Sequence, residues 1–326
     1  MPVADRSDVS QGPGGSAPRV SLAVPWLLLV GGASIYGGIF AANKLVAEAG
    51  VPFIAYTFWQ TLIAGVVLFT LSLITRNMPP ISFRHLRHYT IISALGVVLP
   101  VLVLTFVASK LPAGVVTLLI TLTPAMTYVF ALMFRLERFH WISMGGVAVG
   151  LAGVLLIILP DGSLPQPEDV VWVLLLLVVP FMFATNNIIV AMMHPPRTTS
   201  LMLATGLVIT AAVITLPIML ISEGFYGFWQ ATRSGTWAVL WASAINVVTF
   251  LCFFEIIRRT SPVFFAQYNY VIVISGVLWS IALFDENLSP WIWAALAVMI
   301  AGMLLANEGA RRSLRKDGAA QESGQA

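Results

Sequence analysis

The 326-residue chain is strongly apolar, with 59% hydrophobic residues, 10% charged residues and a mean hydropathy of +0.92. A soluble domain carries roughly 25% charged residues, so this chain lacks the polar surface that a water-soluble fold needs. Its apolar runs are continuous over about 20 residues instead of alternating, which also excludes a membrane β-barrel. Composition therefore predicts an all-α integral membrane protein.

Little in the chain points to bound metals or cofactors. The single cysteine, Cys252, can form neither an intrachain disulfide nor a cysteine metal cluster. The four histidines are predicted to lie in short polar connections without metal-ligand spacing. No phosphate-binding P-loop motif occurs, so ATP is not expected to act directly. We predict no cofactor and no metal.

The chain divides into two tails and ten apolar segments. Residues 1–20 are rich in Gly, Pro, Ser and Asp and lack a signal-peptide apolar run, so we expect a disordered cytoplasmic tail. Each apolar segment is near the roughly 20 residues that a helix needs to cross about 30 Å of hydrocarbon. The basic segment 309–326 is predicted to be a cytoplasmic tail close to anionic lipid. The predicted spans are 22–44, 53–75, 89–109, 113–134, 141–159, 169–193, 199–221, 236–257, 263–284 and 290–307.

The distribution of basic residues supports this count. With the N-terminus in the cytoplasm, 14 of the 17 Lys and Arg residues fall on the cytoplasmic side, and only Lys44, Lys110 and Arg233 fall outside. Positive residues concentrate on the cytoplasmic side of membrane proteins, and a miscounted span would scramble this division. We therefore predict a multi-pass protein of the cell (inner or plasma) membrane with both termini cytoplasmic. Its surroundings are the lipid bilayer, and nucleic acid is not expected as a partner.

The two halves of the chain resemble each other. The segment FAANKLV at 40–46 is echoed by FATNNII at 183–189, an offset of 143 residues. Further marks recur at nearly the same spacing, including Glu137 with Glu286 at an offset of 149. Five spans per repeat give the repeats opposite orientations in the membrane. We therefore predict two inverted five-helix repeats, 21–160 and 161–308.

Several motifs together are typical of one transporter family. They are Lys44 at the end of the first span, the Leu111–Gly114 segment, Pro124, Leu136–Arg138, Gly145–Val154, Glu286 and Ala301-Gly302. On these residues the chain resembles the EamA-like branch of the drug/metabolite transporter superfamily, over about residues 22–307. This resemblance implies ten helices, alternating access around a central cavity, and helices 5 and 10 placed away from that cavity. The sequence departs from the family at Gln60, where an arginine is frequent, and in span 9, which has no counterpart of Pro124.

Polar residues at matched positions of the repeats are the first candidates for a substrate site. Lysine at mid-span costs roughly 2.5–3.5 kcal/mol, so polar groups in hydrocarbon tend to mark function or a paired partner. Asn43 and Asn186 either hold a polar solute or bond neighbouring helices together. Asn187 stands where the first repeat has Lys44. Lys44 either snorkels to the interface or attracts a carboxylate.

Two aromatic and amide clusters are further substrate-site candidates. Tyr56, Trp59 and Gln60 of span 2 suit a flat or amphipathic ligand, although Trp59 can equally pack and Gln60 bond a neighbouring helix. In span 9, residues 267–270 read Gln-Tyr-Asn-Tyr. Gln267 and Tyr270 share one helix face and the two residues between them point elsewhere, so we expect one of these pairs to line the cavity. Gln267 and Tyr270 are taken as the candidates, with the choice of pair left open.

Glu255 is the only acidic residue well inside a predicted span. Arg258 and Arg259 follow it at i+3 and i+4, so one interpretation is a salt-bridged helix end. The other is a proton carrier that couples transport to a proton gradient. In span 5, Gly146 and Gly150 form a small-xxx-small pair, which predicts close helix packing within the molecule or between copies and leaves a homodimer open.

The sequence predicts a secondary transporter of a small organic solute, which is an amino acid, a metabolite or a drug. We expect it to work by alternating access in the direction of export. An uptake permease or an exchanger of the same fold is the alternative. A lipid-modifying membrane enzyme would need clustered acids or a nucleophile with its base at membrane depth, which the predicted spans lack. A non-transporting scaffold is the remaining alternative, and the chain is not expected to be an enzyme.

Overall fold

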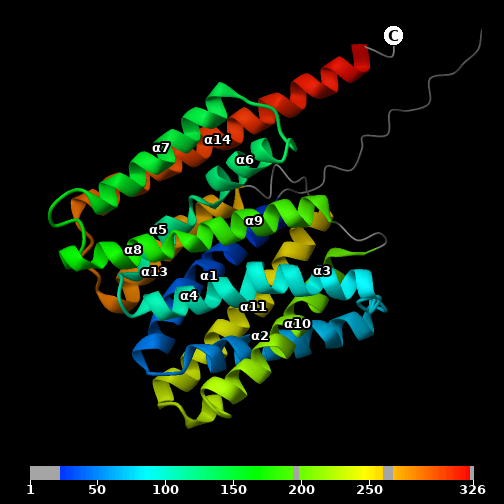
Figure 1. Ribbon diagram of the computed structural model, residues 1–326, viewed down its shortest axis with the longest axis vertical. Helices are drawn as coiled ribbons and strands as arrows, with labels where there is room; N and C mark the ends of the chain where they lie inside the picture. Colours follow the sequence, from blue (N-terminus) through cyan, green and yellow to red (C-terminus); the bar gives the residue numbers. More distant parts are fainter. Residues whose placement is uncertain (1–22, 194–197, 260–266, 324–326) are drawn as a thin grey trace, which may run out of the picture.

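The computed structural model describes residues 23–193, 198–259 and 267–323. Helices joined by short loops make up this part of the chain (Figure 1). In chain order they are α1 (Ala23–Glu48), α2 (Phe53–Ile74), α3 (Phe83–Ser93), η1 (Ala94–Val98), α4 (Leu99–Ala108), α5 (Ala113–Ile120), α6 (Thr123–Met133), α7 (Trp141–Ile158), η2 (Pro167–Asp169), α8 (Val170–Leu176), α9 (Val178–Met192), α10 (Ser200–Ser222), η3 (Phe228–Gln230), α11 (Arg233–Arg259), α13 (Tyr268–Phe284) and α14 (Pro290–Ser323).

The predicted all-α membrane fold is confirmed. Nine helical stretches in the described residues are long and apolar enough to cross a membrane, and α13 is a shorter apolar helix at the place of predicted span 9. Spans 3, 4 and 6 each consist of consecutive helical segments. The predicted N-terminal tail at 1–20 lies outside the described residues. Helix α14 continues to Ser323, through most of the segment predicted as a C-terminal tail, and projects past its neighbours (Figure 1).

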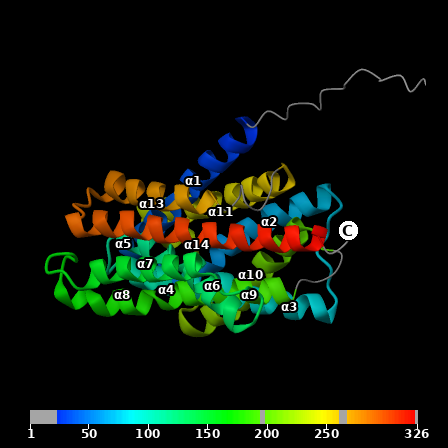
Figure 2. The same ribbon diagram turned by 90° about the horizontal axis from the view of Figure 1, so that it is seen from above.

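The two halves of the chain interdigitate. Helices α7 and α14 pack side by side at one edge, and α2 packs against α10 and α11 at the opposite edge (Figure 1). Between them α1 packs on α11 and α13, while its N-terminal turns lean out of the bundle (Figure 2). Nearly all of these contacts pair a helix of the first half with one of the second. The halves therefore bury their apolar faces mainly against each other.

The α7–α14 contact depends on small residues. Ser143 Oγ donates to the Ala306 carbonyl at 3.1 Å, across the two helices. A Cβ added to Gly302 would lie 2.6 Å from the backbone nitrogen of Gly150, so the backbones touch at this point. Gly146 is equally close to α14, since its Cβ would lie 2.6 Å from the Gly302 carbonyl. The predicted small-xxx-small pair thus packs within the molecule.

Span 4 is broken at its centre by Pro124. Proline has no N–H, so the carbonyl of Ile120, four residues earlier, loses its helical donor. The hydroxyl of Thr123 donates to this carbonyl instead, at 2.8 Å. The helix consequently stops as α5 and starts again as α6, with Thr121 and Leu122 between them.

The two ends of the bundle differ in charge. One end, here the Glu286 end, carries the loops 49–52, 109–112, 159–166, 223–232 and 285–289. The other, here the basic end, carries the loops 75–82 and 134–140.

Contrary to the sequence prediction, His85 and His88 do not lie in a connection but in the first turns of α3, where His88 is 2% exposed.

Candidate functional site

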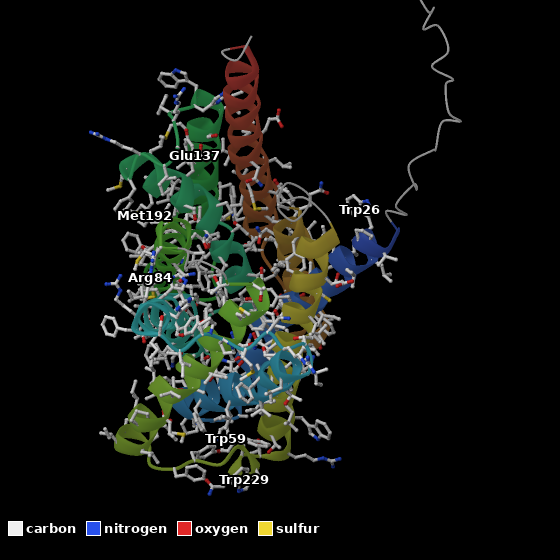
Figure 3. The ribbon with its side chains drawn as sticks, turned by 90° about the vertical axis from the view of Figure 1, so that its right-hand side faces the viewer. Trp26, Trp59, Arg84, Glu137, Met192 and Trp229 are labelled. Carbon is white, nitrogen blue, oxygen red and sulfur yellow. The ribbon has the colours of Figure 1, made fainter. Side chains whose placement is uncertain are left out.

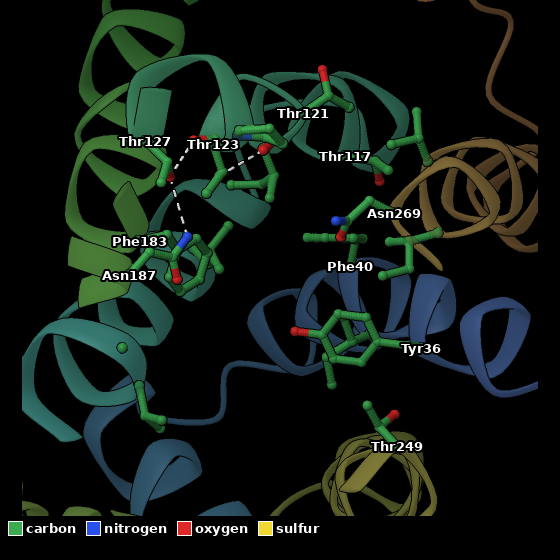
Figure 4. Close-up of a pocket in the computed structure, with 18 of the residues that line it drawn as sticks. Tyr36, Phe40, Thr117, Thr121, Thr123, Thr127, Phe183, Asn187, Thr249 and Asn269 are labelled. Carbon is green, nitrogen blue, oxygen red and sulfur yellow. Dashed lines mark hydrogen bonds between the residues drawn. The ribbon is translucent and has the colours of Figure 1, made fainter. Parts of the chain in front are cut away.

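A cavity of about 700 Å³ lies between the two halves of the chain (Figure 4). Its size and mostly apolar lining are typical of small-molecule sites. Glu137 is the only charged side chain in the described lining. The polar residues among the described lining are Tyr36, Asn43, Gln60, Thr61, Thr117, Thr121, Thr123, Thr127, Tyr128, Glu137, Asn187, Asn246, Thr249, Asn269 and Asn307.

The cavity reaches one end of the bundle and stops short of the other. On α1 its described lining stops at Asn43, and on α2 it starts at Gln60, two turns inside the Glu286 end. In the opposite direction the lining extends to Glu137, in the loop after α6, and to Asn307 of α14. Figure 3 looks onto the end that carries Arg84 and Glu137. The cavity is therefore closed at the Glu286 end and extends to the basic end.

The closure includes an ion pair between the two halves. Lys44 Nζ of α1 lies 2.6 Å from Glu286 Oε1, and their side chains are only 15% and 8% exposed. The same ammonium lies 4.4 Å from the centre of the Phe284 ring. Charge pairs this poorly solvated are weakly screened and depend strongly on both partners. Lys44 thus does not line the cavity but fastens α1 to the end of α13.

Glu286 also caps a helix of the other half. Helix α5 begins after Pro112, which has no side-chain acceptor for the free N–H groups of the first turn. Glu286 accepts from the amides of Ala113 and Gly114, at 2.9 and 3.3 Å. Asp285 ends α13 in a left-handed conformation (φ 49°), and the resulting turn of the chain allows the Glu286 side chain to contact the start of α5. One carboxylate therefore connects α1, α5 and α13.

A second long-range cap repeats the arrangement at α2. This helix begins after Pro52, again without a side-chain cap of its own. Glu223, in the loop after α10, accepts from the amides of Ile54 and Ala55 at 3.2 and 2.9 Å. Carboxylates at helix N-termini also interact favourably with the helix dipole. Helices α2 and α5, which both begin at this end, are thus each capped by an acidic residue of the second half.

Two amides form the closed end of the cavity. Asn43, 3% exposed, accepts at Oδ1 from the hydroxyl of Tyr56 at 2.5 Å. Gln60, also 3% exposed, accepts at Oε1 from Asn246 Nδ2 at 3.0 Å. Within the described part of the chain, Gln60 Nε2 is buried without a hydrogen-bond partner. Buried polar atoms are normally paired, so this nitrogen is notable.

Threonines of the broken span 4 form one wall (Figure 4). Thr117, Thr121 and Thr123 line the cavity, and each hydroxyl donates to a backbone carbonyl three or four residues earlier, at 2.8, 2.7 and 2.8 Å. Thr127 does the same to the Thr123 carbonyl and also accepts from Asn187 Nδ2 at 3.2 Å. Because each of these hydroxyls is already committed as a donor, its oxygen can only accept further hydrogen bonds.

Among the predicted site residues, Asn43, Gln60 and Asn187 line the large cavity, whereas Tyr56 and Trp59 do not. Tyr56 is fully buried behind Asn43. Trp59 donates from Nε1 to the Tyr226 carbonyl at 2.8 Å and stacks edge-on with Trp229, at 5.3 Å between ring centres (Figure 3). Trp59 therefore packs against the loop after α10.

Asn186 does not line the cavity either. A Cβ on Gly96 would come within 3.0 Å of the Asn186 side chain, so this amide packs directly on η1, the π-helical turn of span 3. Its Oδ1 is buried without a hydrogen-bond partner in the described residues. The repeat-matched asparagines thus differ in place: Asn43 lines the cavity and Asn186 lies against a neighbouring helix.

Neither candidate residue of span 9, Gln267 or Tyr270, lines the large cavity. Asn269 lines that cavity, whereas Tyr268 is 3% exposed and packs among buried residues of α1 and α11. Gln267 and Tyr270 face a smaller pocket beside α14, where the Tyr270 hydroxyl accepts from Asn307 at 2.7 Å. At 100° per residue, Asn269 lies on a different face from both, and the sequence alone did not show which face points inward.

Glu255 is half-buried near the end of α11 and does not appear in the described lining. The side chains of Arg258 and Arg259 lie outside the described residues, so the predicted ion pairs with them stay a prediction. In the described residues no group of three or more His, Cys, Asp or Glu side chains is placed to hold a metal ion.

Sequence reasoning missed several lining residues, among them Tyr36, Asn246 and Glu137. Asn246 could have been found by the rule that singled out Asn43, because it is an amide in the middle of an apolar span. The expectation that helix 10 lies away from the cavity is wrong for its middle turns, since Met303 and Asn307 of α14 line the cavity. Helix 5, α7, contributes no residue to the described lining.

The fold and the cavity define a multi-pass helical membrane protein whose two halves enclose a small-molecule site. The sequence matches a model of the EamA-like transporter family twice, over residues 24–159 and 170–307. The chain belongs to this family, whose members are typically transporters of small solutes and not enzymes. The two matches coincide with the two five-helix halves and confirm the predicted duplication.

Comparison with individual proteins adds support for the fold. One solved structure, described as the crystal structure of a protein, superposes with a TM-score of 0.61 at 17% sequence identity. The alignment covers 89% of this chain and 98% of that one. At this identity the likeness shows a shared fold alone. No match was found among curated proteins.

Proposed function

We propose that the protein is a secondary transporter that moves a small, uncharged or zwitterionic organic solute by alternating access. The observation that carries this proposal is the cavity between the two halves, closed at the Glu286 end and extending to the basic end. A site between inverted repeats that is closed on one side is what one state of an alternating-access cycle requires.

The ion pair at the Glu286 end is suited to break and re-form during a transport cycle. Lys44 and Glu286 come from different halves, so relative movement of the halves separates them. The adjacent residue Asn43 lines the cavity. Solute bound at Asn43 therefore acts on the same turn of α1 that carries the ion pair. This adjacency supports a coupling between occupancy of the cavity and closure of the Glu286 end.

The proposed direction is export. The excess of Lys and Arg at the basic end supports a cytoplasmic position for that end and an outside position for the Glu286 end. In this state the cavity can be loaded from the cytoplasm, as the first step of export requires, and uptake or exchange through the same state is the alternative. An amino acid, a metabolite or a drug fits a cavity of about 700 Å³.

The lining also bears on the charge of the solute. In its described part the lining has no Lys, Arg or His, and Glu137 is its one acidic residue. A net anion would lose its hydration without gaining a counter-charge. Hydroxyl and amide groups can replace the hydration of uncharged polar groups. This supports uncharged and zwitterionic solutes over net anions.

The experiment that tests the proposal is solute counterflow. Purified protein is screened by thermal shift against metabolites and drugs, since a ligand at 100 times its Kd stabilises by about 2.7 kcal/mol. Labelled hits are then followed into vesicles preloaded with unlabelled solute. Transient accumulation of label above equilibrium is expected, and vesicles reconstituted with heat-inactivated protein serve as the control. Binding without any counterflow would contradict the transport proposal.

A further inference from the structure

We infer that the cavity has a fixed hydrogen-bond polarity: its closed end presents donors at Asn43 and Gln60, and its span 4 wall presents acceptors at threonine hydroxyls. This inference rests on the proposed function and deepens it. It assigns the solute class as uncharged molecules that carry an acceptor oxygen at one end and an N–H or O–H donor beside it, such as primary amides.

The donor character of Asn43 follows from Tyr56. The Tyr56 hydroxyl is fully buried, and Asn43 is the partner that the structure gives it. A buried hydroxyl with one amide partner is best satisfied when it donates, because an accepting hydroxyl would leave its own proton unpaired. Tyr56 therefore fixes Oδ1 of Asn43 toward itself. The Nδ2 group is left to donate on the side where Asn43 lines the cavity.

The donor character of Gln60 follows from a chain of two bonds. Asn246 Nδ2 donates to the backbone carbonyl of Ala242 at 3.0 Å, which fixes the orientation of that amide because a carbonyl can only accept. The same nitrogen donates to Gln60 Oε1 at 3.0 Å. The orientation of Asn246 thus sets that of Gln60. Gln60 Nε2 is left as a buried donor without a partner in the described residues, in a side chain that lines the cavity.

The two donors belong to the same end of the cavity. Tyr56 and Gln60 lie one turn apart on α2, so they share one face of that helix. Tyr56 contacts Asn43 of α1 from this face. Asn43 and Gln60 therefore both belong to the part of the lining where α1 meets α2. Since no basic side chain lines the described cavity, a neutral carbonyl loses less hydration there than a carboxylate.

The acceptor character of the opposite wall follows from the helix break. Thr117, Thr121 and Thr123 each use their single hydroxyl proton on a backbone carbonyl. Only their oxygen lone pairs remain for a solute. Thr127 is an example of such an acceptor, because its hydroxyl oxygen accepts a hydrogen bond from the side-chain amide Nδ2 of Asn187 (Figure 4).

The inference is tested by measuring Kd for four probes that share one ring. Benzamide carries acceptor and donor, acetophenone the acceptor alone, ethylbenzene neither, and benzoate a charged acceptor. For the purified full chain we expect acetophenone to bind about tenfold more tightly than ethylbenzene, and benzamide about tenfold more tightly than acetophenone, the order of one buried hydrogen bond per step. Benzoate should bind more weakly than benzamide.

Three variants separate the two sides of the cavity. Gln60→Glu replaces the free donor by an acceptor and should abolish the preference for acetophenone over ethylbenzene. Thr121→Val removes an acceptor and should reduce only the advantage of benzamide over acetophenone. Asn43→Asp tests the second donor and should act like Gln60→Glu. Gln166→Glu is the matched control, since Gln166 is exposed in a loop at the Glu286 end and should leave the order unchanged.

Equal affinities for acetophenone and ethylbenzene, an unchanged preference in Gln60→Glu and Asn43→Asp, or no measurable binding of benzamide would each overturn the inference. Its failure is distinct from that of the transport proposal. Counterflow of another solute with no benzamide binding refutes the polarity alone, whereas benzamide binding with the predicted order and no counterflow refutes transport alone.

Discussion

Lys44 of the first half and Glu286 of the second half form an ion pair of 2.6 Å that closes one end of the central cavity. Glu286 also caps α5, so the pair fastens three helices together. Asn43, next to Lys44 in sequence, lines the cavity. The lining of the cavity and its closure thus depend on adjacent residues of one helix turn.

Removing the lysine should open the Glu286 end. Lys44→Met leaves Glu286 without its counter-ion, and an unpaired carboxylate in a poorly solvated place favours the state in which water reaches it. In a Cys252→Ser background, a cysteine at Thr117 should react several-fold faster with a membrane-impermeant maleimide added from the Glu286 side. Glu48→Gln is the control, because Glu48 is half-exposed and 4.0 Å from Lys44. Equal labelling in both variants would mean that the pair does not hold the closure.

The long-range caps should be measurable as stability. Glu223→Ala removes the acceptor of two amides at the start of α2 and should lower the free energy of unfolding by about 1 kcal/mol, the usual effect of losing a cap. Thermal unfolding of the purified protein checks this. Glu168→Ala, at an exposed position of η2 at the same end, should change stability far less. A loss in Glu168→Ala as large as in Glu223→Ala would contradict the assignment.

Neighbouring glycines of α7 offer a matched pair for the α7–α14 contact. A Cβ at Gly146 would collide with the backbone of Gly302 and Ala306, whereas a Cβ at Gly145 meets nothing within 4 Å. Gly146→Ala should therefore destabilise the protein, and Gly145→Ala should raise stability by up to about 1 kcal/mol through helix propensity. Thermal unfolding of the two variants should thus shift in opposite directions, and shifts of the same sign would argue against this packing.

The break at Pro124 should matter more for transport than for stability. Pro124→Ala restores an N–H that can bond the Ile120 carbonyl, worth about 1 kcal/mol. Continuous helix at this point would move the hydroxyls of Thr121 and Thr123 away from their present places in the cavity wall. We expect a protein at least as stable as the wild type with a strongly reduced counterflow rate. An unchanged rate would show that the break serves no transport role.

Sequence reasoning predicted the architecture well because it depends on composition and on long patterns. Ten apolar segments of membrane-spanning length and nearly constant offsets between repeat marks suffice to specify two five-helix halves. The candidate site was predicted only in part. Asn43, Gln60 and Asn187 line the cavity, yet Trp59, Asn186, Gln267 and Tyr270 do not.

The misses have a physical reason. An amide in an apolar span can face the cavity, a second helix or a loop, and the rotation of the helix decides between them. That rotation is set by contacts with helices from the other half, such as the approach of Asn186 to Gly96. In span 9, a turn of 100° separates Asn269 from Tyr270. The pairing of Lys44 with a residue 242 positions later was likewise beyond any local pattern.

The central claim is that the halves move apart at the Lys44–Glu286 contact in each transport cycle. It is tested most directly by joining these positions as Lys44→Cys with Glu286→Cys, in a Cys252→Ser background, with a short bifunctional thiol reagent. The linked protein should still bind solute, as judged by thermal shift, but show no counterflow, while the unlinked double variant and Cys252→Ser alone should both transport. Counterflow at an undiminished rate in the fully linked protein would contradict the account.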